Sequence, residues 1–167
     1  MMNDAWKAML WGQLGAAIDM LENAIDACPD ALWGDRARRP EFWYTVYHTV
    51  FFLDLYLSGQ LDGFAPPPPY NMDEIDPAGV LPDRVYTRDE MRAYLRHGRD
   101  KCRATIEAMT DEYAARRAGF AWVDLSLGEL MLNNLRHVQH HTAQLNLILR
   151  QEIDFAPRWV KRAEEGG

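Results

Sequence analysis

Apolar residues recur at intervals of three and four over four long segments of this chain, and this spacing constrains the fold more than any other feature. Such spacing places apolar side chains on one face of an α-helix, and no segment shows a convincing strand pattern. The first segment is residues 4–28, which ends before Pro29. The second begins near Pro40 and ends at Leu57. It is apolar on nearly all sides, so this helix is expected to be deeply buried.

Two capping motifs mark the beginnings of the other predicted helices. The stretches TRDE at 87–90 and SLGE at 126–129 each place a hydroxyl residue three positions before a Glu, which is the pattern of a capping box. The helices that follow are predicted to end near residues 109 and 151. The connector between them, residues 110–125, is expected to include a short helical turn at about residues 113–117.

A proline-rich stretch, residues 59–87, separates the second predicted helix from the third and is called the crossover segment below. It contains Pro66 to Pro69 in succession, so it can be neither regular helix nor central strand. Loops of this length are uncommon unless they are functional or disordered. Three roles are open for it: a lid over a site, an arm onto a partner, or a passive connector.

These elements predict an all-α fold, an antiparallel-type four-helix bundle with a long crossover between helices two and three. A length of 167 residues suits one domain with a substantial core. We expect residues 1–152 to form the bundle and residues 153–167 to form a charged tail, with at most a short helix after Pro157.

Net charge and the positions of the cysteines limit the partners and the cellular compartment that we expect for this protein. The net charge is −7, from 25 acidic and 18 basic residues, which argues against nucleic acid as a partner. Cys28 and Cys102 lie far apart, in neither a disulfide framework nor a thiolate metal motif. The chain begins without a signal-peptide pattern, and its most apolar run, residues 46–57, is too short to cross a bilayer. We therefore expect a cytoplasmic protein with no membrane partner.

Three of the five histidines fall within five residues of the last predicted helix. At about 100° per residue, His141 lies near the centre of the predicted buried stripe, and His137 lies one turn earlier on the same face. His140 is turned away by about 100° and is expected at the surface or behind the site. Two imidazoles spaced i, i+4 can reach one cation, so His137 and His141 are candidate metal ligands.

A third ligand is available on the second predicted helix. His48 shares a face with large apolar residues, and three histidines would leave coordination positions open for water or substrate. For His48 alone, the alternative of a core histidine hydrogen-bonded to a neighbour stays open. Tyr44 could donate to a metal-bound species and Gln144 could orient an imidazole or a bound water. The alternative for Tyr44 is a role in the core alone. The alternative for Gln144 is that it shields the contact line between packed helices from solvent.

The same residues carry a resemblance to a known family. The segment 127–150, with SLGEL at its start and H-x-x-H-H-x-x-Q-L at 137–145, resembles the last helix of the DinB/YfiT-like metalloenzyme superfamily. Residues 41–57 resemble the second helix of that family, and residues 27–33 are similar to its helix-one exit. The resemblance implies a four-helix bundle, often dimeric, in which three histidines hold a divalent metal, commonly zinc or nickel. Carried over by position, the ligands are His48, His137 and His141.

The resemblance also implies a chemistry, because family members include thiol-dependent transferases and isomerases that act with low-molecular-weight thiols such as bacillithiol or mycothiol. A three-histidine site can lower the pKa of a bound thiol or water. The leading hypothesis is therefore a homodimeric, metal-dependent S-transferase or related hydrolase with a small-molecule substrate. The alternative hypothesis is a non-catalytic, dimeric helical-bundle protein for interaction or stress response.

Overall fold

The computed structural model describes residues 4–163, and within this range it contains helices and no β-strand. The helices are α1 (Asp4–Ala27), α2 (Asp30–Trp33), α3 (Phe42–Leu57), α4 (Arg88–Ala108), α5 (Asp111–Ala115) and α6 (Leu127–Ile153), with one 3₁₀ turn, η1 (Asp73–Ile75). The predicted all-α fold is confirmed. Helix α2 was not predicted, and the turn that forms α5 begins two residues earlier than predicted.

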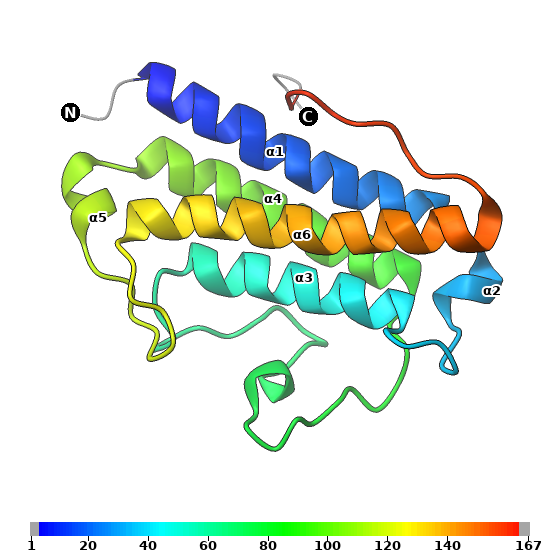
Figure 1. Cartoon of the computed structure of the whole chain (residues 1–167). Coiled ribbons are helices and arrows are strands. Elements are labelled where there is room, and N and C mark those ends of the chain that lie inside the picture. Colours follow the sequence, from blue (N-terminus) through cyan, green and yellow to red (C-terminus); the bar gives the residue numbers. More distant parts are fainter. Residues whose placement is uncertain (1–3, 164–167) are drawn as a thin grey trace.

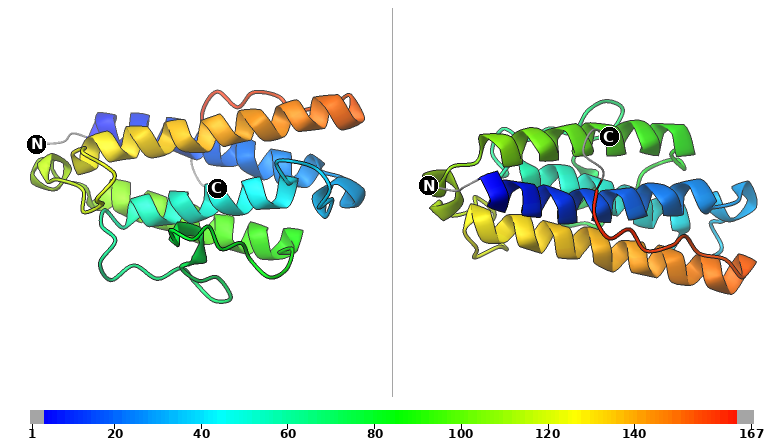
Figure 2. Two further views of the ribbon diagram at one scale, coloured as in Figure 1. Left: turned by 60° about the horizontal axis from the view of Figure 1, so that its bottom comes forward. Right: turned by 90° about the horizontal axis from the view of Figure 1, so that it is seen from above.

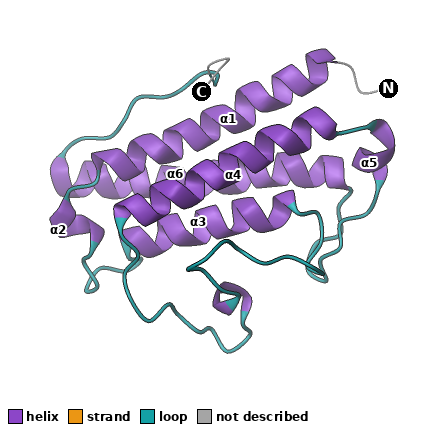
Figure 3. Ribbon diagram, turned by 180° about the vertical axis from the view of Figure 1, so that it is seen from behind, coloured by secondary structure: helices purple, strands orange, loops and turns teal. Residues whose placement is uncertain are grey.

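The four long helices lie side by side (Figures 1 and 2). Helix α6 packs against α1 and α3, and α4 packs against the same two helices. In Figure 1, α1 and α6 run from left to right, whereas α3 and α4 run from right to left. The crossover segment returns from the end of α3 to the beginning of α4, and η1 is its one helical turn (Figure 3).

Helix α3 contributes many of the fully buried aromatic side chains, as its apolar sequence predicts. Phe42, Trp43, Tyr47 and Phe51 are each at most 1% exposed. The same helix buries Asp54, whose carboxylate accepts hydrogen bonds from Lys101 at 2.5 Å and from Tyr94 at 3.1 Å, both on α4. A buried carboxylate needs such partners, so these contacts hold α3 in register with α4.

Helix α6 begins with the capping box that the sequence predicts. The Ser126 hydroxyl accepts a hydrogen bond from the Glu129 backbone N–H, and the Glu129 carboxylate accepts one from the Ser126 backbone N–H. The box at Thr87 and Glu90 is present as well, at the start of α4. Both motifs pair backbone donors that a helix start otherwise leaves free.

Replacing Ser126 by alanine is expected to lower the free energy of unfolding by about 1 kcal/mol, because the first turn of α6 loses the side-chain acceptor of its N-cap. Urea unfolding followed by circular dichroism measures this change. Ser126→Thr keeps a capping hydroxyl and is the matched control. Equal stability of the two variants would contradict the role of the cap.

The tail folds back over α1 as an extended segment. It contains no helix through Ala163, where the expectation allowed at most a short one. The Ala163 backbone N–H donates to the Gly12 carbonyl at 2.9 Å. Residues 164–167 of the predicted tail lie outside the described residues. Among residues 4–163, no helix combines the length and the apolar character that a membrane span requires.

Candidate metal centre

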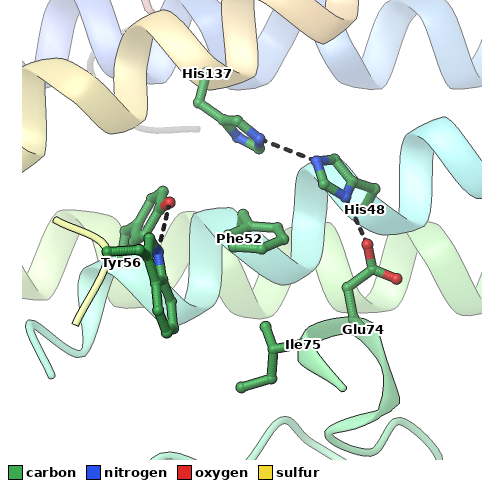
Figure 4. Close-up of a pocket in the computed structure, with 7 residues that line it drawn as sticks. His48, Phe52, Tyr56, Glu74, Ile75 and His137 are labelled. Atoms are coloured by element: carbon green, nitrogen blue, oxygen red, sulfur yellow. Dashed lines mark hydrogen bonds and ion pairs between the residues drawn. The ribbon is translucent and has the colours of Figure 1, made fainter. Parts of the chain in front are cut away.

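Three histidines from two helices converge where α3 and α6 pack together. His48 projects from α3, and His137 and His141 project from α6. One ring nitrogen of each lies within 4.8 Å of those of the other two. The His48 Nε2 and His137 Nε2 atoms are 3.3 Å apart, and their side chains point toward one another (Figure 4). The structure therefore brings together the three residues that the sequence selects, and their role as ligands stays a prediction.

This arrangement fits a divalent cation. Two nitrogens that bind one tetrahedral zinc ion at about 2.0–2.1 Å lie about 3.4 Å apart, close to the spacing observed between His48 and His137. Two facing Nε2 atoms can share only one hydrogen bond, whereas a cation would use both lone pairs. Imidazole nitrogen is a common ligand of zinc and nickel, so the set of donors is consistent with either metal.

Glu74 fixes the orientation of His48 from the crossover segment. Its Oε1 atom lies 2.5 Å from the Nδ1 atom of His48, and its side chain is 2% exposed. A carboxylate at Nδ1 holds the proton there and leaves the Nε2 lone pair directed at the cluster. In Figure 4, Glu74 reaches His48 from the side opposite His137.

Tyr44 contacts Glu74, and its donation to a metal-bound species stays a prediction. Its hydroxyl donates to both carboxylate oxygens of Glu74, at 3.2 and 3.0 Å, and so supports the residue that contacts His48. Burial, together with the Glu74 carboxylate, raises the pKa of Tyr44 above its ordinary value. The phenol therefore stays protonated and keeps its donor.

Gln144 contacts an imidazole, as the sequence suggested. Its Oε1 atom lies 2.8 Å from the Nδ1 atom of His141, which leaves Nε2 as the free nitrogen of that ring. Its amide nitrogen lies 3.3 Å from the Nε2 atom of His140. His140 is exposed and does not belong to the cluster of three.

His141 is less buried than its predicted position at the centre of the buried stripe of α6 implied. Val138 and Thr142 are fully buried, while His137 and His141 are half-buried at the edge of the stripe. The physical reason is that α6 packs against both α1 and α3, so its buried face is centred between those two contacts. The histidines lie on the α3 side, and this position leaves them accessible.

A cavity of about 400 Å³ adjoins the cluster. It is lined by His48, Phe52, Tyr56, Glu74, Ile75, Trp122 and His137. Glu74, Ile75 and Trp122 were not predicted because all three come from connections between helices, and Tyr56 of α3 was not predicted either. For Glu74 and Ile75, the unusual length of the crossover segment was a possible signal. Trp122 lies in the connection between α5 and α6, and no sequence signal indicated it.

The two imidazoles on α6, His137 and His141, have lowered pKa values, which favour the neutral form that binds metals. Burial, reinforced by His141 and His48, lowers the pKa of His137 to about 3. Burial also lowers the pKa of His141, although the hydrogen bond to Gln144 opposes the shift. The His137 Nδ1 atom is buried without a hydrogen-bond partner, which is consistent with this loss of basicity.

The free energy of unfolding of the metal-free protein is expected to fall as the pH drops from about 6.5 toward 3. In that range the unfolded chain binds a proton at His137 that the folded chain does not bind. The free energy of unfolding therefore falls by at most about 1.4 kcal/mol per pH unit. Urea unfolding at several pH values measures this slope. His137→Asn should reduce it, and His140→Asn, at an exposed position, should not. Identical slopes for the two variants would contradict the assignment.

Comparison with known proteins identifies a family whose sequence model matches this chain. A sequence model of the DinB superfamily matches residues 13–145, a range that contains all three clustered histidines and the crossover segment. No curated protein and no solved structure matches the chain.

Proposed function

The chain belongs to the DinB superfamily, and we propose that it is a metal-dependent enzyme whose divalent ion is held by His48, His137 and His141. The observation that carries the proposal is the convergence of three imidazoles, whose candidate ligand atoms lie within 4.8 Å of one another, with His48 Nε2 and His137 Nε2 at a ligand-like spacing of 3.3 Å. In this proposal α1, α3, α4 and α6 form an antiparallel-type four-helix bundle with the crossover segment over the site. Zinc and nickel are the proposed ions because both accept imidazole ligands.

The residues around the cluster are arranged to hold and orient reactants. A divalent ion bound here would lower the pKa of a coordinated thiol or water and favour its nucleophilic form. Three ligands leave coordination positions open, and the cavity lies beside two of the ligands, His48 and His137. Glu74 keeps the Nδ1 proton of His48 in place, and Tyr44 steadies Glu74.

Within this class we propose transfer of a low-molecular-weight thiol to a small electrophile, with hydrolysis as the related reaction. The resemblance to thiol-dependent members of the family supports the thiol, and the cavity beside the cluster provides space for the second reactant. Thiol transfer makes use of the open positions without a separate nucleophilic side chain. We include a homodimer in the proposal on the same resemblance.

The test is conjugation of bacillithiol to chlorodinitrobenzene by zinc- or nickel-loaded protein. Turnover is expected with metal, and both a chelator and His137→Ala should abolish it, whereas His140→Ala should retain it. Equal turnover with and without chelator would rule out the metal-dependent mechanism. A metal-loaded protein that shows no turnover with thiols or water as the nucleophile would favour the alternative, a non-catalytic interaction protein.

A further inference from the structure

The cavity beside the histidines has one polar end and one apolar end. At the polar end lie His48, His137 and the buried carboxylate of Glu74. The remaining lining side chains are Phe52, Tyr56, Ile75 and Trp122. Figure 4 shows Phe52 and Ile75 between the polar end and Tyr56. A ligand in this cavity therefore meets imidazole and carboxylate groups at one end only.

The aromatic rings form a continuous wall that begins at the cluster. The Phe52 ring lies 4.8 Å from the His48 ring and 5.5 Å from the His137 ring, measured between centroids. The Tyr56 ring follows at 5.4 Å from Phe52. Trp122 joins the wall by donating its indole N–H to the Tyr56 hydroxyl at 3.4 Å. A flat group that enters the cavity would find ring surfaces along the wall.

Trp122 is placed as a ligand contact more than as a core residue. It lies in the connection between α5 and α6, and 49% of its surface is exposed although it borders the cavity. Phe120 supports it, with ring centroids 5.5 Å apart. Covering this indole would remove apolar surface from water, which is favourable.

The charge of the cavity lining disfavours an anionic group away from the metal site. Among the described residues, no lysine or arginine lines the cavity, so such a group would find no cationic side chain there. The Glu74 carboxylate already accepts hydrogen bonds from His48 and Tyr44. A volume of about 400 Å³ lies within the usual range for small-molecule sites.

We propose that this cavity binds a small molecule that joins a metal-binding head to a flat apolar or aromatic group. The head lies at the three histidines, and the flat group lies between Phe52 and Trp122. This inference rests on the proposed function, because it needs the ion, and it names the substrate class of that site. For thiol transfer, the flat group belongs to the electrophile.

The experiment compares two hydroxamates that share a metal-binding head and differ in the attached group. Acetohydroxamate and benzohydroxamate are titrated calorimetrically into zinc-loaded parent, Trp122→Ala and Trp159→Ala proteins. Benzohydroxamate should bind the parent about tenfold more tightly or better, and Trp122→Ala should reduce that preference to about threefold or less. Any difference in metal affinity between the two probes themselves is the same in every protein, so it cancels when the preferences of the proteins are compared.

The control variant is matched in residue type. Trp159 is 64% exposed in the tail and does not line the cavity, so Trp159→Ala should keep the full preference. Trp122→Phe should restore most of the preference if a ring surface is what matters. Acetohydroxamate should bind all four proteins equally.

The outcomes separate the two proposals. Failure of the parent to retain zinc or to bind either hydroxamate contradicts the proposed function. Retained zinc with equal affinity for both hydroxamates contradicts the apolar subsite and leaves the metal site standing. A preference that survives Trp122→Ala unchanged also overturns the inference, because the flat group would then lie elsewhere.

Discussion

Replacing His137 by alanine is expected to abolish stoichiometric metal binding, with a loss of affinity greater than about 100-fold. The reason is that His48 and His141 alone would supply two of the three nitrogen ligands, which is fewer than zinc sites in proteins normally have. His48→Ala and His141→Ala should have the same effect. Elemental analysis of untagged protein, incubated with zinc or nickel and then desalted, measures the metal content.

The matched control is His140→Ala, which removes a neighbouring imidazole on the same helix from outside the cluster. It should retain metal at the parent level. Circular dichroism shows whether each variant keeps its helices, and His137→Gln provides a less disruptive replacement if His137→Ala loses them. A parent protein that binds neither metal would remove the basis of the enzyme proposal.

The helices were predictable because their signals are local. Spacing of apolar residues identified the four long helices, and the boxes at Thr87 and Ser126 located the first turns of α4 and α6 to within a residue. Helix α2 was missed because it has four residues, fewer than one clear repeat of the helical pattern. The path of the tail against Gly12 also depends on tertiary contacts that no local pattern encodes.

The candidate site was predictable in part for the same reason. His137 and His141 are one turn apart on one helix, so their proximity follows from helical geometry. Glu74 lies 26 residues from His48, beyond a stretch without periodicity, and only the folded crossover segment brings them together. The burial of His141 was overestimated, because residue spacing along one helix cannot show that α6 packs against two neighbouring helices.

Of the three roles left open for the crossover segment, the structure disfavours that of a passive connector. Its turn η1 places Glu74 against His48 and Ile75 at the cavity, while Tyr70 packs on Tyr94 of α4 with ring centroids 4.3 Å apart. A passive connector would not need a buried carboxylate. The segment therefore forms part of the wall of the candidate site, and its conformation is linked to the orientation of His48.

Glu74→Gln is expected to lower metal affinity about 10- to 100-fold, because partners that orient a ligating imidazole typically contribute this much. The amide would remove the charged acceptor at the Nδ1 atom of His48, and the ring could then turn its other nitrogen toward the cluster. Tyr44→Phe should cause a smaller loss, because Glu74 remains. Competition with a chromophoric chelator measures each affinity.

Asp73→Asn is the matched control for Glu74→Gln, since both replace a carboxylate in the same turn. The Asp73 side chain accepts a hydrogen bond from Asn71 and is not part of the histidine cluster, so its replacement should leave metal affinity unchanged. Equal affinities for the two variants would show that His48 is oriented without Glu74. A loss confined to Glu74→Gln, together with faster hydrogen exchange in η1 when metal is removed, would establish that the crossover segment and the metal site stabilise one another.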